Sequence, residues 1–492
     1  MTDNDVQPGP MPMGAALTYQ ASRDPDAPAL TMGDQTLTRR EVDRAANRMA
    51  RALAALGIGQ DDRVAVVLPN GPRHQITCFG AWKLGALVIP LPPKIADEEL
   101  LQLAEEGDPK IVIGVEPGRV SGRATLPADF VPDPSLSDEP MPDAVATVWK
   151  ASTSGGSTGR PKLLWERRPS IIDPNVPHAI LHMKTDDVVL HPAPAYHNAP
   201  FNHTNSALCW GSHVVLMERF DATEWLRLVE HHQVHWAYLV PTMMSRILAL
   251  PEEVRGAADV SSLELVIHMA APCPPWVKQG WIDWVGPEKV WEVYAGTEGY
   301  GLTTINGVEW LEHVGSVGKA SAGTEIHDDD DNLLPPGEIG TVYFRPPPNN
   351  VLGHHAVPQT YGDMGSLDED GYLYLSDRRT DMILTGGANL YPAEIEGAIE
   401  QVPGVVGVAV VGLPDPDLGA KAHAIIEIAA DAPPPDPSAI AEFLTTKLSR
   451  NKIPYTCEFV TTPLRDEAGK IRRRTLREAR LETDPSGYLR LR

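Results

Sequence analysis

The sequence has little that would tie the protein to a membrane, to nucleic acid or to an oxidising compartment. Its four cysteines, Cys78, Cys209, Cys273 and Cys457, show no CxxC or His-spaced pattern, so we expect free thiols. No run reaches the roughly 18 apolar residues of a membrane span, and the N-terminus lacks the pattern of a signal peptide. With 42 basic and 66 acidic side chains the net charge is -24, which disfavours nucleic acid and anionic membranes. We expect a cytoplasmic protein without membrane insertion and without a nucleic-acid partner.

What the chain does contain is a regular alternation of short β-branched runs and amphipathic stretches. Its 492 residues exceed one ordinary domain, and 42% hydrophobic with 22% charged residues is typical of a globular protein. The helical spacing over residues 38–56 begins at Thr38, with Glu41 three residues later in the pattern of a capping box. This alternation predicts the α/β class, with a large N-terminal domain of parallel or mixed sheets flanked by helices.

The pattern of predicted strands and helices changes twice in the second half of the sequence. From about residue 315, hairpin-like runs such as "EIGTVYFR" and "GYLYLSD" predict a β-barrel-like subdomain. After residue 384 a compact α+β unit is predicted, with a helix beginning at about Pro437 behind the candidate cap Asp436. We place the domain boundary at "SDRRTD", so that residues 1–376 form the large domain and residues 382–492 the small one.

The stretch "STSGGSTGRPKLLWE", residues 152–166, concentrates glycines and hydroxyls before a single lysine. Glycine lets backbone amides approach an anion closely, and Ser and Thr add donors, so the stretch is typical of a phosphate-binding loop. The alternative is a flexible surface linker. A Walker A loop is excluded by spacing, because Gly156 would need its partner glycine at Pro161 and Lys162 is followed by Leu163.

Three further stretches carry side chains that suit nucleotide chemistry. "YAGTEG" (294–299) offers Glu298 as a magnesium ligand, with a turn or N-cap acid as the alternative. "TYGDMGSL" (360–367) offers Asp363 to accept ribose hydroxyls, with an Asx turn as the alternative. "LRDEAGKIRRRTLRE" (464–478) offers Lys470 on a loop after a glycine, with a basic tail as the alternative.

Together these stretches resemble the AMP-forming adenylating superfamily of acyl-CoA synthetases, adenylation domains and luciferases. "TSGGSTGRPK", "YAGTEG", "YGDMG", "DRRTDMI" and "AGKIRRRTLRE" occur in the order that is typical of that family. The resemblance covers about residues 15–480 and implies a mobile C-terminal domain that rotates about a hinge at 377–381, with Thr380 or Asp381 as the hinge residue.

Carried over by position, the resemblance implies a role for each matching residue. The phosphates of ATP would be bound by Thr153, Ser154, Gly155, Gly156, Ser157, Thr158 and Lys162. Thr297 would contact the α-phosphate, Glu298 would hold Mg2+, and the adenine would lie against Tyr294, Ala271 and Pro272. Asp363 and Arg378 would bind the ribose, and Lys470 would bridge the acid and the α-phosphate. "MAAP" and "YAG" replace more glycine-rich family segments, which affects the adenine fit rather than the reaction class.

The same resemblance points to an acid pocket around "PAPAYHNAPFN" (192–202). His197 would line the carboxylate or gate the acceptor, with a structural histidine as the alternative. The pocket would be lined by Tyr196, Trp210, Met243, Met244 and Tyr300, for which ordinary core packing is equally open. Amino-acid activators carry an aspartate in this segment, and "AYHNAPF" has none, so we expect an apolar or aromatic acid.

The sequence therefore predicts an enzyme that uses ATP and Mg2+ to convert a carboxylic acid to acyl-AMP and pyrophosphate. Coenzyme A is the expected acceptor, as in the bile-acid-type acyl-CoA ligases that the chain resembles. An amine is the alternative, as in stand-alone amide bond synthetases of the same branch. A catalytically silent nucleotide-binding or acyl-binding paralogue is the third hypothesis. The sequence does not specify the acid, the pathway or the oligomeric state.

Overall fold

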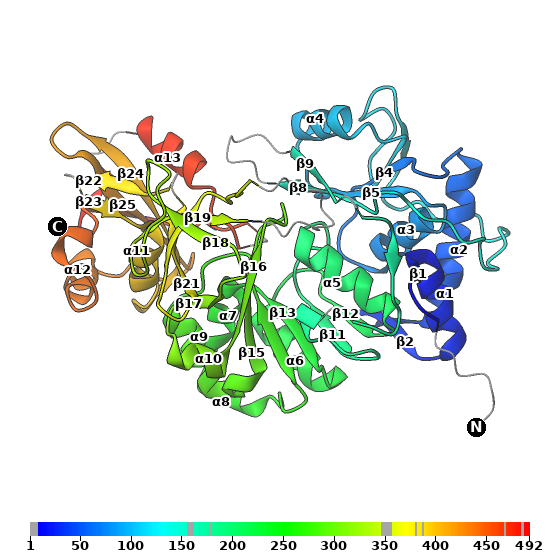
Figure 1. The fold of residues 1–492 in the computed structure, drawn as a ribbon, viewed down its shortest axis with the longest axis horizontal. Coiled ribbons are helices and arrows are strands. Elements are labelled where there is room, and N and C mark those ends of the chain that lie inside the picture. The colour runs from blue at the N-terminus through cyan, green and yellow to red at the C-terminus, as the bar shows by residue number, and fades with distance from the viewer. Residues whose placement is uncertain are drawn as a thin grey trace.

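The structure is a computed structural model that describes residues 8–154, 162–166, 168–177, 179–345, 357–378, 381–385, 388–466, 469–483 and 487–492. Among the predicted site residues, Gly155, Gly156, Ser157, Thr158 and Thr380 lie outside the described residues, as do the side chains of Ser154 and Arg378. Figure 1 shows the N-terminal part of the chain in blue and cyan, the central sheet in green and the C-terminal unit in yellow to red.

The largest sheet has eight strands in the order β16-β15-β14-β13-β11-β12-β2-β3. Its six inner strands are parallel, and antiparallel β16 and β3 close its two edges. The strands are β2 (Pro28–Met32), β3 (Gln35–Thr38), β11 (Val188–His191), β12 (His213–Leu216), β13 (Trp236–Leu239), β14 (Leu265–His268), β15 (Val290–Ala295) and β16 (Leu302–Asn306). The predicted mixed sheet of an α/β protein is therefore present.

A second, parallel sheet of the N-terminal half has the strand order β5-β4-β6-β7. It consists of β4 (Arg63–Val66), β5 (Leu87–Pro90), β6 (Ile111–Ile113) and β7 (Ala124–Leu126). Beside it lies the antiparallel hairpin of β8 (Ala151–Ser154) and β9 (Lys162–Trp165), and the short strands β1 (Met11–Pro12) and β10 (Ile171–Ile172) also pair. Val88 forms a parallel bridge with Lys150, which joins the β5 edge to the start of the hairpin.

Helices cover these sheets, and the helix that follows β3 begins at the cap that the sequence predicts. In α2 (Arg39–Ala55) the Thr38 hydroxyl accepts from the Glu41 N–H and the Glu41 carboxylate accepts from the Thr38 N–H, so the predicted capping box is confirmed. The other helices up to residue 312 are α1 (Met13–Arg23), α3 (Pro72–Trp82), α4 (Asp97–Gly107), α5 (Asn198–Cys209), α6 (Ala222–His232), α7 (Pro241–Leu248), α8 (Glu252–Ala257), α9 (Pro275–Val285) and α10 (Gly307–Glu312), with 3-10 turns η1 (Ala179–Leu181) and η2 (Pro287–Lys289).

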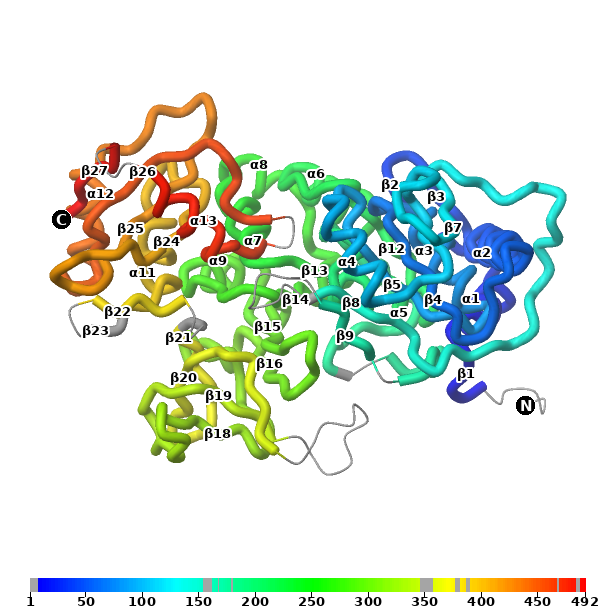
Figure 2. Tube along the Cα trace, turned by 90° about the horizontal axis from the view of Figure 1, so that it is seen from above, coloured from blue at the N-terminus to red at the C-terminus, as the bar shows by residue number. Residues whose placement is uncertain are grey.

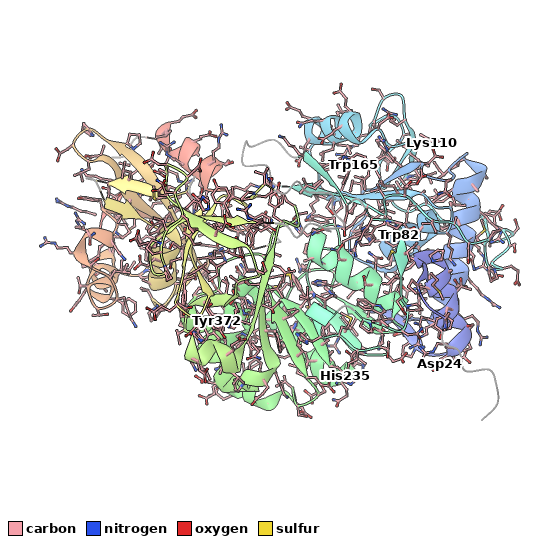
Figure 3. All side chains as sticks on the ribbon, in the orientation of Figure 1. Asp24, Trp82, Lys110, Trp165, His235 and Tyr372 are labelled. Carbon is pink, nitrogen blue, oxygen red and sulfur yellow. The ribbon has the colours of Figure 1, made fainter. Side chains whose placement is uncertain are left out.

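Aromatic side chains fill the core between the two sheets. Trp82, labelled in Figure 3, is fully buried and stacks on Trp149 with ring centroids 5.8 Å apart. The Phe201 ring of α5 approaches Trp82 edge-on, with ring centroids 5.8 Å apart. The core thus connects α3, the start of the β8–β9 hairpin and α5.

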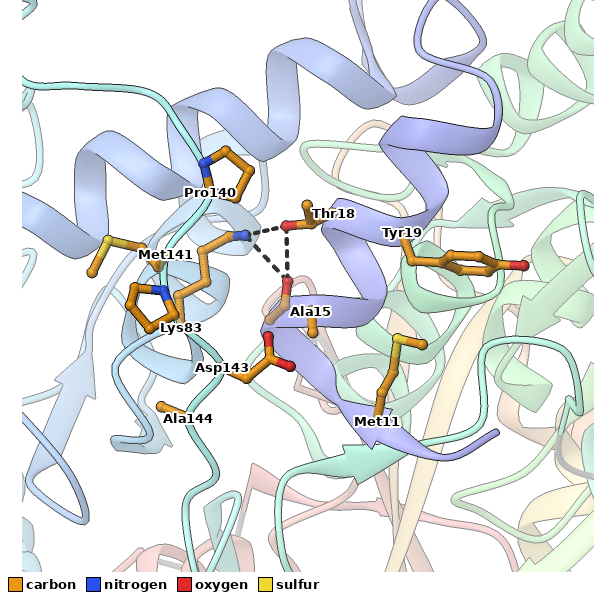
Figure 4. Close-up of a pocket in the computed structure, with 11 residues that line it drawn as sticks. Met11, Ala15, Thr18, Tyr19, Lys83, Pro140, Met141, Asp143 and Ala144 are labelled. Carbon is orange, nitrogen blue, oxygen red and sulfur yellow. Dashed lines mark hydrogen bonds between the residues drawn. The ribbon is translucent and has the colours of Figure 1, made fainter. Parts of the chain in front are cut away.

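A buried ion pair fixes α1 to the two helices that follow it. The Lys83 ammonium lies 2.7 Å from Asp43 Oδ1 and donates to Thr18 Oγ1 at 2.8 Å and to the Gly14 carbonyl at 3.1 Å. Lys83, Thr18 and Gly14 border a cavity of about 260 Å3 between α1 and residues 140–144 (Figure 4). Burial lowers the pKa of Lys83, and the charge of Asp43 opposes that effect.

The predicted hairpin strands after residue 315 form a five-stranded antiparallel sheet in the order β17-β21-β20-β19-β18. Its strands are β17 (Ser316–Lys319), β18 (Thr324–His327), β19 (Gly340–Phe344), β20 (Asp363–Leu367) and β21 (Tyr372–Arg378). Asp363 and Arg378 are register partners across β20 and β21, so the backbone brings the two predicted ribose residues opposite each other.

The C-terminal unit has its own apolar core between Ile383 and Leu491. Its strands are β22 (Ile383–Thr385), β23 (Ala388–Leu390), β24 (Val405–Asp415), β25 (Gly419–Ile428), β26 (Thr456–Val460) and β27 (Leu489–Arg490), and its helices are α11 (Pro392–Ile399), α12 (Pro437–Thr445), η3 (Arg450–Lys452) and α13 (Arg473–Leu481). Asp436 caps α12 by accepting from the Ser438 N–H, as predicted. The domain boundary at 377–381 stays a prediction.

The four cysteines are free, and Cys78, Cys209 and Cys457 are buried, which confirms the expected thiols. In the described part of the chain, no helix combines the length and apolarity needed to span a membrane.

Candidate active site

Four loops meet at one edge of the eight-stranded sheet. Strands β15, β14, β13 and β11 are neighbours and parallel, so their carboxyl ends lie at the same edge. The connections that leave these ends are residues 296–301, 269–274 and 192–197, and the single residue Val240, which joins β13 to α7. In open parallel sheets, ligands bind where such loops gather. This edge carries Tyr294, Thr297, Glu298, Ala271, Pro272 and His197 of the sequence-predicted site.

An aromatic cluster lies beside Asp363, and one of its members contacts the Asp363 carboxylate. The Tyr294 hydroxyl donates to Asp363 Oδ2 at 2.6 Å, which joins β15 to β20. The Tyr300 and Tyr361 rings stack with centroids 5.2 Å apart, and the Tyr361 hydroxyl donates to the Gly301 carbonyl at 2.8 Å. A Cβ atom added at Gly296 would lie 2.2 Å from the Tyr361 ring, so only glycine fits there.

Glu298 lies on the turn between β15 and β16, facing this cluster. Burial is the main cause of the raised pKa of Tyr300 and of Tyr361, and the negative charge of Glu298 adds to both shifts. Among the described residues no group of three or more His, Cys, Asp or Glu side chains could hold a metal ion. A single carboxylate fits Mg2+ of the kind that takes most of its ligands from substrate phosphates and water.

The loop after β14 has an unusual backbone. Ala270 adopts φ +79°, a conformation that glycine would adopt without strain. The "MAAP" segment therefore places an alanine in a backbone conformation that favours the glycine of a more glycine-rich segment. Ala271 is half-buried and Pro272 is exposed at the end of the loop. Beneath it the Lys278 ammonium lies 2.7 Å from Glu292 Oε2, and both side chains are buried.

The lysine loop of the C-terminal unit lies against the large domain. Gly469 has φ +76°, and an added Cβ would lie 3.1 Å from Val240 Cγ2 and 3.4 Å from Thr242 Oγ1. The Lys470 N–H donates to Asp466 Oδ1 at 3.0 Å, which closes the turn. Figure 2 shows the red segment before α13 reaching α7, in agreement with these distances.

His197 of the large domain lies near enough to this loop for the charges of the loop to act on it. Burial lowers the pKa of His197 to about 4, and the charges of Lys470 and Arg472 also lower it whereas that of Asp466 raises it. His197 Nε2 is buried and has no hydrogen-bond partner among the residues that the structure describes. The Tyr196 ring lies 4.4 Å from the His197 ring. The C-terminal lysine loop and the "PAPAYHNAPFN" segment therefore face each other.

The β8–β9 hairpin positions the ends of the predicted phosphate-binding loop. Ser154 and Lys162 are register partners, as are Thr153 and Leu163, so the chain leaves and re-enters the hairpin at one point. Lys162 is exposed at this end.

In the C-terminal unit, the predicted hinge residue Asp381 forms an ion pair. Its Oδ2 lies 3.0 Å from the Arg473 guanidinium, which also lies 2.7 Å from the buried Glu396 carboxylate.

The predicted acid-pocket residues separate into two groups. Tyr196 and Tyr300 lie in the loops described above, and Met243 and Met244 are buried on α7, which follows the Val240 loop. Trp210 follows α5 at the end opposite His197, and its indole donates to the Asp173 carbonyl at 3.1 Å. Because a twelve-residue helix is about 18 Å long, Trp210 lies away from the sheet edge.

Sequence reasoning did not single out Tyr361, Asp466, Arg473 or Lys150. Tyr361 stands two residues before Asp363 in "TYGD", and Asp466 stands four residues before Lys470, so proximity in sequence is the signal for both. The charged partners of Arg473 and the partners Glu166 and Asn198 of Lys150 are distant in sequence, and no local pattern points to them.

Comparison with known proteins agrees with this geometry. The family model of AMP-binding enzymes matches residues 17–353. A feruloyl-CoA synthase of Amycolatopsis sp is 30% identical over an alignment of 496 positions, gaps included. The alignment covers 93% of this chain and 97% of that protein. A long-chain-fatty-acid–CoA ligase of Mycobacterium tuberculosis is 30% identical over 495 residues, covering 92% of this chain and 95% of the relative.

Solved structures share the fold over nearly the whole chain. The o-succinylbenzoate CoA synthetase of Bacillus subtilis, in complex with its acyl-adenylate intermediate, has a TM-score of 0.77 at 24% identity and covers 95% of this chain and 98% of its own. The amide bond synthetase of Marinactinospora thermotolerans has a TM-score of 0.76 at 22% identity and covers 95% of this chain and 100% of its own. The chain thus belongs to the family of AMP-binding enzymes, and it is an AMP-forming ligase.

Proposed function

We propose that the protein activates an apolar or aromatic carboxylic acid with ATP and transfers the acyl group to coenzyme A. The observation that carries the proposal is the meeting of the lysine loop with the sheet edge. Gly469 packs on the Val240 loop, and the charges of Lys470 and Asp466 act on His197. The same edge carries Tyr294 and Glu298, and the Tyr294 hydroxyl donates to Asp363 on β20.

In the first step a carboxylate oxygen attacks the α-phosphorus of ATP, the bond to the β-phosphate oxygen breaks, and acyl-AMP and pyrophosphate form. Two anions must approach each other, so the Lys470 ammonium between them stabilises the charge of the transition state. Thr297 would donate to the α-phosphate, and Asp363 and Arg378 would hold the ribose. When bound at Glu298 and the ATP phosphates, Mg2+ would neutralise part of the phosphate charge.

In the second step the thiol of coenzyme A attacks the acyl carbon, AMP leaves, and a proton is released. The 30%-identical relatives are named as CoA ligases, for feruloyl and for long-chain fatty acids, which supports a thiol acceptor and an apolar acid. His197 lies where the acid would enter, and burial keeps its imidazole neutral near pH 7. A neutral imidazole does not compete with Lys470 for the substrate carboxylate.

The test is a panel of aromatic, fused-ring and medium-chain acids with ATP and Mg2+, each with coenzyme A, with amines, or with neither. We expect acid-dependent pyrophosphate release that coenzyme A accelerates, with a thioester identified by mass spectrometry. An amide product formed only with amines would replace coenzyme A by an amine acceptor. Absence of acid-dependent release across the panel, with ATP bound, would favour the silent paralogue.

A further inference from the structure

Lys150 is a buried cation that the proposed mechanism does not use. It directly precedes β8, and its side chain is only 2% exposed. Its ammonium donates to Ser152 Oγ at 2.8 Å, lies 3.1 Å from Glu166 Oε2, and forms a close hydrogen bond to Asn198 Oδ1. The ammonium lies 5.1 Å from the Trp149 ring centroid and 5.9 Å from that of Phe201, so aromatic faces enclose it.

The partners of Lys150 come from three elements that border the candidate site. Ser152 lies on β8, Glu166 directly follows β9, and Asn198 is the first residue of α5 and the neighbour of His197. The Ser152 hydroxyl also donates to Asn198 Oδ1 at 3.2 Å. One ammonium therefore links both arms of the β8–β9 hairpin to the start of the helix that carries the His197 turn.

Such an arrangement is costly unless it is fully paired. Taking an ammonium out of water costs several kcal/mol, and attraction to a carboxylate recovers that cost only when the geometry is good. An apolar side chain of similar volume often serves stability as well as a buried ion pair does. What an apolar side chain does not provide is a set of directional contacts to three separate elements.

We propose that Lys150 is a positioning residue that holds the β8–β9 hairpin against the start of α5, and thereby sets where the ATP phosphates lie relative to the acid near His197. This inference rests on the proposed function, because it takes residues 153–162 as the segment that binds the phosphates. Lys150 differs from Lys162 and Lys470 in that it acts through Ser152, Glu166 and Asn198 rather than on a substrate.

The protonation state of Lys150 provides a readout that a purely structural lysine would not. Burial lowers the pKa of Lys150 to about 8, the charge of Glu166 opposes this effect, and that of Arg168 adds to it. Glu166 and Arg168 are the charged groups that face the ammonium, and Ser152 and Asn198 are neutral. As the pH rises through about 8 the ammonium loses its proton, so ATP affinity should fall over the same range.

The experiment compares three variants of the full-length protein, Lys150→Met, Glu166→Gln and Lys83→Met. Lys83→Met is the matched control, because Lys83 is equally buried and paired with Asp43 at 2.7 Å but bonds α1 and α2 instead of the hairpin. ATP affinity is measured by calorimetry from pH 6.5 to 9, and the KM values for ATP and for an active acid are measured beside it.

We expect Lys150→Met to weaken ATP binding and raise the KM for ATP about tenfold or more, the order of effect of one lost charged hydrogen-bond network. Lys83→Met should lower the thermal midpoint and leave ATP affinity unchanged. Glu166→Gln should move the loss of ATP affinity to lower pH, because the carboxylate that raises the pKa of Lys150 is gone.

Three results would overturn the inference. These are equal ATP affinity in Lys150→Met and wild type, an equal loss of ATP affinity in Lys83→Met and Lys150→Met, or an unchanged pH profile in Glu166→Gln. If Lys150→Met does not fold, Asn198→Ala carries the test, since it removes only the link to α5; an unchanged KM for ATP would then refute the inference. Wild-type pyrophosphate release is measured first, so that failure of the proposed function is recognised separately.

Discussion

Replacing Gly469 by alanine tests how the lysine loop is held. Gly469 has φ +76°, and its N–H donates to the Asp466 carbonyl in the turn that presents Lys470. An L-residue with a side chain is disfavoured in this conformation by about 1 to 2 kcal/mol. Its Cβ would also lie 3.1 Å from Val240 Cγ2, which leaves little room to relax. At about 1.4 kcal/mol per tenfold, the loop should leave this turn roughly 5- to 30-fold more often.

The rate of adenylation should fall, by at most the same factor, because Lys470 leaves with the turn. The assay is acid-dependent pyrophosphate release by Gly469→Ala, with Gly419→Ala as the control. Gly419 has φ +79° at the first position of β25, and an added Cβ would meet only the Leu384 carbonyl at 3.9 Å. The control should lose a similar amount of stability and keep its rate. An unchanged rate in Gly469→Ala, or an equal loss in both variants, would refute the reasoning.

Three further predictions concern single groups and pH. Lys470→Met should lower pyrophosphate release on the order of 100- to 1,000-fold with little change in the thermal midpoint, and a loss below tenfold would contradict its role. Asp363→Asn should raise the KM for ATP about tenfold, measured by steady-state kinetics, because the partner of the Tyr294 hydroxyl loses its charge, whereas an unchanged KM would place the ribose elsewhere. Burial lowers the pKa of His74, His213 and His268 to about 4 from an ordinary 6.5, so their contribution to stability is complete above pH 6.5 and is lost as the pH falls towards 4. Urea unfolding at pH 7.5 and pH 5 should show a free energy of unfolding that is lower at pH 5 by on the order of several kcal/mol. Equal free energies at the two pH values would refute the lowered pKa values of these histidines.

Local signals in the sequence predicted the elements and the order of the motifs. The capping box at Thr38, the cap at Asp436 and the hairpin runs after residue 315 act over a few residues, so their structures follow from nearby sequence. The alternation of strands and helices predicted the sheet, and a parallel sheet places loops 192–197 and 296–301 at one edge.

Contacts between distant segments could not be predicted in this way. The fit of Tyr361 over Gly296 depends on how β20 meets β15, and the pairing of Lys150 with Glu166 and Asn198 depends on how the hairpin meets α5. Trp210 is near a site motif in sequence but lies one helix length away from it in space, and its role in the acid pocket stays a prediction. The predicted roles of individual site residues remain predictions that the variants above can test.

The central claim is that the protein forms an acyl-adenylate. The most direct measurement is exchange of radiolabelled pyrophosphate into ATP, with Mg2+ and an acid but without any acceptor. The account predicts exchange that requires the acid and disappears in Lys470→Met. Release of ADP and phosphate in place of AMP and pyrophosphate, or exchange that survives in Lys470→Met, would contradict it.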